Sequence, residues 1–529
     1  MDNRNTDMPR TGTEFLLTPE GQRPQVGFFK KNLTTELSSD YTLPDYLPEI
    51  RKMLGVNTRI SPVSRYIGNN GIEFSGRVDY DVIYVGGDGR LTCAPLGTDF
   101  SFEVQPDIPD GIKWDSSGDA YADIETDMLH TRVTAPRKLN IKCRLRAFAH
   151  AYSYEDVSLD MHGHTMGAEK LTNEVSCSEI HRHMSEVIEL SDEIDTGWGA
   201  DITEVILSNG NVKIVDSDMS IGDGNRLNCR GEVIADIVYK NTESGELRKE
   251  TRRIPFSETI EAEIDRNMTS SPIGHNVRGI CGEIKTTPSD GKILLDTEVI
   301  LEGESAENIP LRLTEDIFIP GGKCKTEYRP FTFSEVKKCA NCETVAKGTY
   351  PLSDISASEG CEIVETIPMS VRVEEINTDE NTAVMNGKCK VMAITRNGDE
   401  FSSGEVYLPF SYNTGINTSG EKLIITSRPF ATSCRAKCDG GNMSIEADIT
   451  LPICALSEKT VRIAQSLECE NQPLTKTGGI TVYYPEKSEK LWDIAKKFGI
   501  SLRNLAEAND LPMTGGRETP SGKNYMIIY

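Results

Sequence analysis

Signatures of catalysis and nucleotide binding are missing from this sequence. No GxxxxGK[ST] loop, no strand-linked GxGxxG, no GxSxG elbow and no HExxH pair occurs among its 529 residues. Acidic residues number 82, and no pair of carboxylates stands out against that background. Because no nucleophile, acid or base is placed in a recognisable constellation, we expect no enzymatic activity and no cofactor.

Long apolar runs are also missing. No stretch of 18 apolar residues exists, so we expect no membrane span. The polar first residues lack the apolar segment of a secretory signal, which predicts a protein that stays in the cytoplasm where it is made. In that reducing compartment the 14 cysteines are expected to be free thiols, mostly buried.

Basic residues are few relative to acidic ones. The 57 lysines and arginines against 82 acidic residues give a formal net charge of −25. Such a surface repels phosphate backbones and anionic lipids, which excludes nucleic acid and membrane surfaces as main partners.

What the sequence does contain is hydrophobic alternation of period two, the pattern of half-buried strands. The clearest stretches are 74–85, 139–152, 227–240, 292–305, 383–396 and 442–456. Turn sequences such as those at 86–90, 241–246, 288–292 and 396–400 separate strands from their neighbours. The predicted fold is therefore mainly β.

The strands recur with a period of roughly 150 residues. Each copy combines a helix-like apolar start, a strand, a turn, a second strand and a further strand pair. The helix-like starts lie at 43–57, 196–210 and 359–373. We predict tandem β-sandwich-like repeats at 28–158, 184–306 and 314–457, followed by a polar linker at 466–479.

The last fifty residues, 480–529, have a different pattern. A strand is predicted at 480–484 and a closing strand beside it at 524–529. Between them, apolar stripes predict two helices, the first with Leu491, Ile494, Ala495 and Phe498 and the second with Leu502, Leu505 and Ala506. Ser488 and Ser501 are the expected N-caps, and Gly499 the left-handed residue that ends the first helix. The prediction is a small α+β module of βααβ order.

This module resembles the LysM family. The resemblance is carried by Leu491-Trp492-x-Ile494-Ala495, Phe498-Gly499, Leu505, Asn509 and the final apolar strand. It implies binding of N-acetylglucosamine polymers or of a protein, in a groove between two loops. The residues of that groove would be Ser488, Glu489, Lys490, Leu491, Trp492, Asn509, Asp510, Leu511, Pro512 and Met513.

The sequence departs from the family at Ser488-Glu489-Lys490, where Gly-Asp-Ser/Thr is usual. Replacing the Gly limits the backbone conformations of the first loop, which disfavours a sugar ligand and leaves a protein ligand open. We expect Trp492, Ile494, Leu505 and Ile527 to form the core of the module. For Trp492 the alternative is a direct contact with the ligand.

The upstream repeats resemble SPOCS domains of clostridial spore-coat proteins, through the Leu-Pro-Asp-Tyr-Leu-Pro-Glu-Ile segment at 43–50 and the paired strands after it. Three such copies followed by one LysM module are similar to the coat-morphogenesis proteins of clostridia. The resemblance implies a non-enzymatic protein of the spore envelope, made in the mother cell and then located on the forespore surface or in the spore coat.

The same resemblance implies the partners. The LysM module would dock on a coat basement-layer protein, a coat morphogenetic ATPase of the SpoIVA type. The β-rich repeats would recruit other coat proteins or self-associate. The alternative is a peptidoglycan- or cortex-glycan-binding protein acting through the LysM module. A wall hydrolase is a third reading, which the lack of hydrolase features upstream disfavours.

Two groups of residues are candidate metal ligands. Cys339 and Cys342 form a single CxxC, whereas a structural zinc site needs four ligands, so we expect a turn with two free thiols. The second group is His162, His164, Cys177, His181 and His183. A His-x-His pair on a strand projects from one face and can bind a transition metal. This group falls between repeats, where chance surface histidines are common. We therefore expect no metal site.

Overall fold

The computed structural model describes residues 23–68, 71–105, 119–163, 166–220, 226–261, 273–378, 382–417, 422–473, 479–512, 516–520 and 525–528. The fold is mainly β, as predicted, with two short α-helices near the C-terminal end. Neither helix of the described residues is long and apolar enough to cross a membrane.

The first unit consists of two sheets packed face to face. One sheet contains β2 (Ile50–Ile60), β3 (Ser64–Ile67), β4 (Ile72–Gly86) and β5 (Leu91–Val104). The other contains β1 (Gln25–Thr42), β6 (Asp119–Ala135) and β7 (Lys138–Tyr154). Inward residues of β7 are buried at almost every second position, and they meet Val78, Tyr80 and Val82 of β4 in one apolar core.

The second unit has the same pairing order. One sheet is β11 (Thr203–Ser220), β12 (Arg226–Asn241) and β13 (Leu247–Ile260). The facing sheet has β10 (Ile188–Asp195), β14 (Gly274–Ser289) and β15 (Lys292–Phe318), with β9 (Glu169–Met184) also on β15. Val233, Ile237 and Tyr239 pack against Leu295 and Val299 across the two sheets.

The third unit repeats this order again. One sheet is β17 (Glu362–Thr378), β18 (Ala383–Asn397) and β19 (Glu400–Asn413). The other has β16 (Gly322–Pro351), β20 (Leu423–Ser427), β21 (Phe430–Asp439) and β22 (Asn442–Pro473), with β8 (Asp160–Gly163) added to β22. Two short 3₁₀ turns, η1 (Ala200–Ile202) and η2 (Leu352–Ile355), precede β11 and β17.

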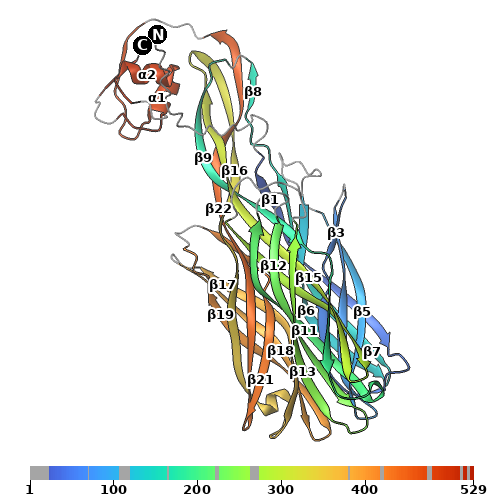
Figure 1. Ribbon diagram of the computed structural model, residues 1–529. Coiled ribbons are helices and arrows are strands. Elements are labelled where there is room, and N and C mark those ends of the chain that lie inside the picture. Colours follow the sequence, from blue (N-terminus) through green and yellow to red (C-terminus); the bar gives the residue numbers. More distant parts are fainter. Residues whose placement is uncertain are drawn as a thin grey trace, which may run out of the picture.

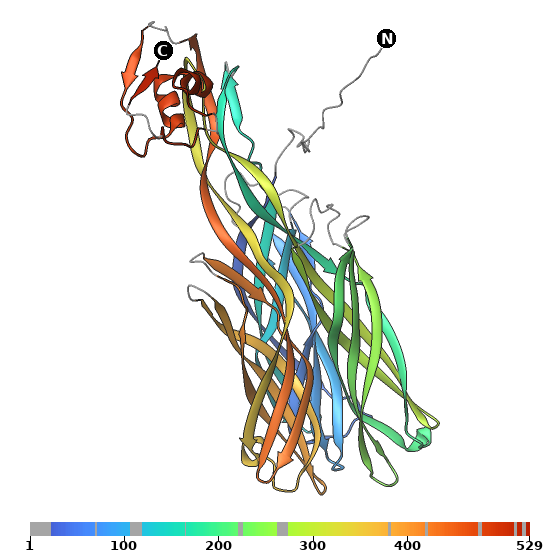
Figure 2. The ribbon, with the colours of Figure 1, turned by 60° about the vertical axis from the view of Figure 1, so that its left-hand side comes forward.

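The three units lie side by side and share an apolar junction (Figure 2). Each unit gives it residues from the outer face of its middle strand, namely Ile83 and Val85 of β4, Val238 of β12, and Met392 and Ile394 of β18. Those strand ends are therefore buried on both faces, and their sequences are continuous apolar runs rather than alternations. Burying one large aliphatic side chain contributes about 1.5–3 kcal/mol to stability. The junction therefore holds the units firmly together.

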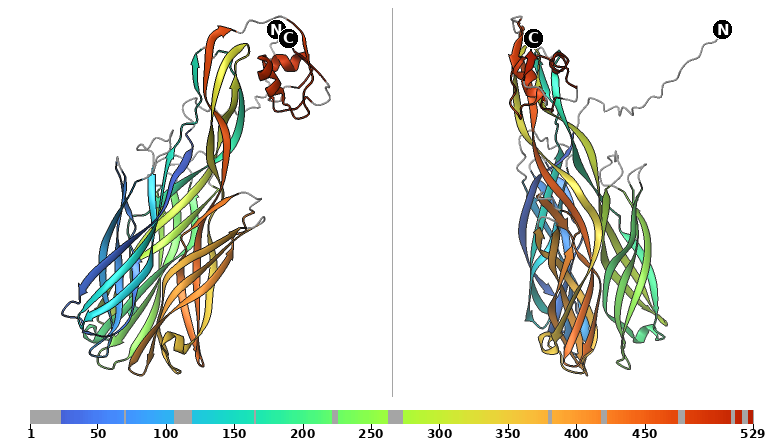
Figure 3. Two further views of the ribbon diagram at one scale, coloured as in Figure 1. Left: turned by 180° about the vertical axis from the view of Figure 1, so that it is seen from behind. Right: turned by 90° about the vertical axis from the view of Figure 1, so that its left-hand side faces the viewer.

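A long β extension rises from the units (Figure 1). We define it as β8, β9 and the adjoining ends of β15, β16 and β22, residues 303–318, 322–338 and 455–473. Buried residues along it include Cys177, Leu311, Leu313, Phe331 and Ile463, so the extension has its own core. The two helices and their small sheet lie at its far end in both views of Figure 3.

Two predictions about the repeats are wrong. The helix-like starts are not helices, because 50–57, 203–210 and 362–373 lie in β2, β11 and β17, and their apolar residues pack between sheets. The expected linker at 466–479 is in part a strand, since β22 continues to Pro473 opposite Gly322 of β16. The many polar residues of 466–473 gave this segment the composition of a loop.

Candidate functional site

The C-terminal module has the βααβ order that its sequence predicts. Strand β23 (Thr481–Tyr483) pairs antiparallel with β24 (Met526–Ile528), and α1 (Leu491–Phe498) and α2 (Leu502–Ala508) lie between them in sequence. Leu491, Trp492, Ile494, Ala495 and Leu505 are buried in one cluster with Met526 and Ile528. Ile527, which we expected in the core, is only half-buried, because its neighbours Met526 and Ile528 face inward.

The helix ends confirm two of three predicted signals. Ser501 caps α2 by accepting a hydrogen bond from the Asn504 N–H at 3.0 Å. Gly499 ends α1 in the left-handed region with φ 62°. Ser488 is not the cap of α1. That position belongs to Lys490, whose N–H donates to the Asp493 carboxylate.

The module is docked on the extension through a shared apolar cluster. Phe318 of β15 meets the Trp492 ring edge-to-face with centroids 5.0 Å apart, and Leu171 of β9 joins the same cluster. Trp492 is 3% exposed. The expectation that it is a core residue is therefore confirmed, although part of that core belongs to the extension.

A polar cluster beside it centres on Asp316 of β15. Its carboxylate accepts hydrogen bonds from Trp492 Nε1 at 2.8 Å, Lys496 Nζ at 2.6 Å and the Tyr328 hydroxyl at 2.6 Å. Burial opposes the charge of Asp316, but these donors outweigh it and hold the pKa of Asp316 below its ordinary value. Gly321 N–H also donates to the Gly499 carbonyl at 2.7 Å. The orientation of the module is thus fixed by several directional contacts.

The structure divides the predicted groove residues into two classes. Ser488, Lys490, Asp510 and Pro512 are exposed, whereas Leu491, Trp492 and Asn509 are buried and Glu489 and Leu511 are half-buried. Met513 lies outside the described residues. The groove as predicted is therefore only partly a surface.

The buried residues of the predicted groove make hydrogen bonds within the module. Asn509 donates to the Leu505 and Ile527 carbonyls and accepts from Ile527 N–H, which ties α2 to β24. The first backbone donors of α1 are also taken, because Leu491 and Trp492 N–H bind the carbonyls of Glu518 and Gly516 at 2.9 and 3.0 Å. Backbone groups that a sugar's acetamido group would need at this point are already occupied.

Sequence reasoning missed a second surface on the module, the outer face of its two-stranded sheet. Val482 stands opposite Ile527 in the register, and Tyr484 and Tyr525 lie next to them with ring centroids 6.4 Å apart. Ile480, Val482, Tyr484 and Tyr525 are 76%, 50%, 69% and 51% exposed. We call Ile480, Val482, Tyr484, Tyr525 and Ile527 the apolar face. Its signal in the sequence was the apolar side chains at alternate positions 480, 482 and 484, which share one face of the strand.

The CxxC pair is not a turn, contrary to the prediction. Cys339 and Cys342 lie within β16, where residues three apart point to opposite faces. Cys339 is opposite Cys454 of β22, and Cys342 is buried in the core of the third unit. The two thiols cannot therefore meet at one metal ion.

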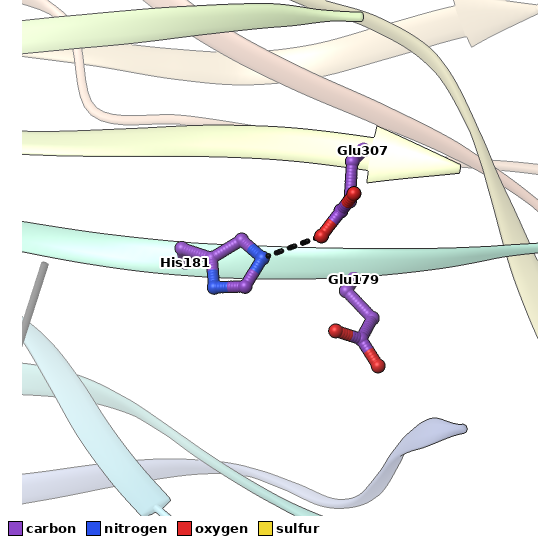
Figure 4. Close-up of side chains that lie close together, drawn as sticks. All are labelled: Glu179, His181 and Glu307. Atoms are coloured by element: carbon purple, nitrogen blue, oxygen red, sulfur yellow. Dashed lines mark hydrogen bonds and ion pairs between the residues drawn. The ribbon is translucent and has the colours of Figure 1, made fainter. Parts of the chain in front are cut away.

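Of the candidate histidines, only His181 and His183 lie together. Both are buried on one face of β9, whereas His162 lies on β8 opposite Glu468 and His164 is outside the described residues. Two residues that the sequence did not point to, Glu179 and Glu307, join His181 instead (Figure 4). His181 Nε2 is 3.2 Å from Glu307 Oε1.

A cavity of about 910 Å³ lies where the three units meet. Arg428, from the β20–β21 turn, forms ion pairs with Asp123 of β6 at 3.2 Å and with Glu302 of β15 at 2.9 Å. Burial raises the pKa of Asp123, but Arg428, Arg182 and other nearby cations together outweigh burial and hold this pKa below its ordinary value. One guanidinium thus connects all three units, and the paired charges of this cavity are those of a structural junction.

A second charged contact joins the second and third units. Lys249 Nζ of β13 is 2.8 Å from Glu365 Oε1 of β17. Burial raises the pKa of Glu365 to about 7, although Lys249 opposes the shift. The side chain of Glu365 is fully buried.

Comparison of the chain with models of protein families, with curated proteins and with solved structures found no match.

Proposed function

We propose that this chain is a non-enzymatic assembly protein of the spore envelope that bridges a coat basement-layer protein and other coat proteins. The C-terminal LysM-like module would bind a coat morphogenetic ATPase of the SpoIVA type. The three two-sheet units, which we interpret as SPOCS repeats, would recruit coat proteins or a second copy of the chain. The protein would be made in the mother cell and collect on the forespore surface.

The observation that carries the proposal is the apolar face at the far end of the extension. Soluble proteins rarely leave neighbouring aromatic and aliphatic side chains exposed on one small sheet unless that surface is used for binding. Tyrosine is enriched where few side chains supply most of the affinity of a protein interface. The extension holds this face away from the units, where a large partner can reach it.

A protein ligand fits the module better than a glycan in the predicted groove. The backbone donors of Leu491 and Trp492 are already bonded within the module, and Asn509 is held between α2 and β24. These groups are not available to a sugar without local unfolding. The exposed groove residues that remain, such as Lys490 and Asp510, are charged.

One observation favours the alternative, a glycan-binding protein. Tyr484 and Tyr525 present two exposed rings on one face, and aromatic rings are surfaces on which sugar rings pack. A glycan would then bind on the sheet and not between the predicted loops.

Binding to a SpoIVA-type ATPase tests the proposal. The full chain is compared with a Tyr484→Ala/Tyr525→Ala variant by calorimetry, and we expect the affinity to fall roughly 10- to 100-fold, as for loss of an interface hot spot. The control is Tyr66→Ala, because Tyr66 on β3 is 70% exposed, like Tyr484 at 69%. The control should bind within twofold of the unaltered chain.

Two further results would count against the proposal. Heat of binding with chitin oligomers that the double substitution abolishes, with no binding to the ATPase, would establish the glycan alternative. A fluorescent fusion that stays diffuse throughout sporulation would contradict a place in the coat.

A further inference from the structure

One face of β9 carries four metal-ligating side chains in succession. Cys177, Glu179, His181 and His183 occupy alternate positions of the strand, so they project from the same face. All four are buried, with at most 5% of any one exposed. The proposed function in coat assembly uses none of them.

Glu307 of β15 completes a compact donor set with two of these residues. Glu307 is the direct register partner of Glu179, and His181 follows two residues later on the same face. One ligand atom from each of the three side chains lies within 4.8 Å of the other two. Figure 4 shows the Glu307 carboxylate directed at the His181 ring, with the Glu179 side chain beside them.

The distances suit a metal ion. Two ligand atoms that are each about 2.1 Å from one ion are separated by roughly 3.0–3.4 Å. His181 Nε2 and Glu307 Oε1 are 3.2 Å apart. The ligand atoms of the three side chains lie within 4.8 Å of one another, so Glu179 has to move closer when the ion binds.

The burial of this set is unusual for ionisable groups. Glu179, His181 and Glu307 are 3%, 5% and 0% exposed. Burying a carboxylate costs several kcal/mol, and fully buried carboxylates in proteins are paired or coordinate metals. A dication between Glu179, His181 and Glu307 would be attracted by both carboxylates, in addition to the partners that these side chains already have.

We propose that Glu179, His181 and Glu307 bind one divalent first-row transition ion, such as Mn²⁺, Fe²⁺ or Zn²⁺. One imidazole with two carboxylates is a donor set that these ions accept, and it lacks the many oxygen ligands that Ca²⁺ requires. The ion fastens β9 to β15 at the root of the extension.

His183 supplies an independent indication. It is 2% exposed, and its Nε2 atom lies 2.8 Å from the Ser305 hydroxyl. A buried imidazole on the same face of β9, two residues from His181, is a partner for a water molecule bound to the ion.

Mn²⁺ is the appropriate first probe, because the 14 cysteines compete for zinc but are poor ligands for manganese. The full chain, stripped of metal with a chelator and returned to chelator-free buffer, is titrated with Mn²⁺ alone. Electron paramagnetic resonance measures the free ion. We expect one Mn²⁺ bound per chain and a rise of several degrees in the unfolding midpoint.

Glu179→Gln and Glu307→Gln test the ligands while preserving side-chain volume. Each should weaken Mn²⁺ binding roughly 100-fold or more, since ligand loss exceeds the 10- to 100-fold effect of losing an outer-shell partner. The matched control is Glu174→Gln, on the same strand but exposed and paired with Arg312. It should leave binding unchanged.

Folding of each variant is checked by circular dichroism. If a glutamine variant does not fold, X-ray absorption of the Mn²⁺-loaded unaltered chain decides, with an oxygen and nitrogen shell that includes a single imidazole expected. No bound ion at saturating Mn²⁺, equal binding by a folded glutamine variant, or a shell without imidazole would each overturn the proposal.

Discussion

The three units and the C-terminal module obtain their cores in different ways. Each unit closes an apolar core between two sheets of its own, as Val233 and Leu295 do in the second unit. The module is small, and it completes its core with Phe318 and Leu171 of the extension. A short segment buries too little area to be stable on its own, and packing against a neighbour supplies the missing part.

The contacts between parts differ in the same way. The units are joined by an apolar junction and by buried ion pairs such as Lys249 with Glu365. The module is joined by a small apolar cluster around Phe318 and Trp492, by the carboxylate of Asp316 with its three donors, and by single polar contacts such as the hydrogen bond from Gly321 to Gly499. The module should therefore be lost first when the protein is perturbed, while the units remain folded together.

Trp492→Ala should have the largest effect on the module. Removing this buried ring deletes both its packing and the hydrogen bond to Asp316, and we expect a loss of about 3–5 kcal/mol. Hydrogen exchange should accelerate in α1 and α2 while β12 of the second unit keeps its protection. Equal acceleration in β12 would show that the two regions are one cooperative unit. Trp492→Phe, which keeps most of the packing, is the milder control.

Glu365→Gln tests the contact between Glu365 and Lys249 through the pH dependence of protein stability. The pKa of Glu365 is about 7 in the folded chain against an ordinary 4.5, so between those values the folded state keeps a proton that the unfolded state releases. Stability therefore falls as pH rises through this window, by up to roughly 3 kcal/mol at 1.36 kcal/mol per pKa unit.

Urea unfolding of the full chain at pH 5 and pH 8 measures this effect. The glutamine variant should show a smaller loss of stability between the two pH values than the unaltered chain. Identical losses in the two proteins would mean that Glu365 is ionised in the folded state throughout, held by Lys249.

Asp316→Asn should release the module with a smaller effect, about 1–2 kcal/mol, the scale of hydrogen bonds to a charged group. The folded pKa of Asp316 lies below its ordinary value of 3.8, so its contribution is present above pH 3.8 and disappears as pH falls through the folded pKa. Limited proteolysis near the module between pH 3 and 7 measures the docking. The control is Asp510→Asn at an exposed position. The protease should cleave this variant no faster than the unaltered chain.

Tyr484→Ala should have the smallest effect on stability, within about 0.5 kcal/mol, because the side chain is 69% exposed. Thermal unfolding of the full chain provides the measurement. A clear fall in the midpoint would show that the apolar face supports the module and is not simply a surface for a partner.

The elements that the sequence predicted correctly are those specified by local patterns. The alternation in 139–152 and 442–456 predicts β7 and part of β22, and the stripe from Leu491 to Phe498 predicts α1. These patterns succeed because strand and helix periods are set by nearest neighbours in the chain.

The extension was missed because it depends on pairing between distant segments. β9 pairs with the far end of β15, and β8 with the far end of β22, while their sequences lie in what we took for spacers between repeats. Glu307 was missed for the same reason, since only the register places it opposite Glu179. The predicted groove stays a prediction, but the sequence did not indicate that carbonyls of Gly516 and Glu518 accept hydrogen bonds from the first donors of α1.

The two longest strands, β16 and β22, run as one antiparallel ribbon from the bottom of the third unit to the end of the extension. At about 3.3 Å per residue, a strand of some 30 residues spans roughly 100 Å. A force directed along the axis of β22 loads the hydrogen bonds between β16 and β22 in shear. These bonds then share the force and do not break one after another. Over residues 322–351 and 442–473, this ribbon therefore transmits tension from the extension into the third unit through continuous strand pairing.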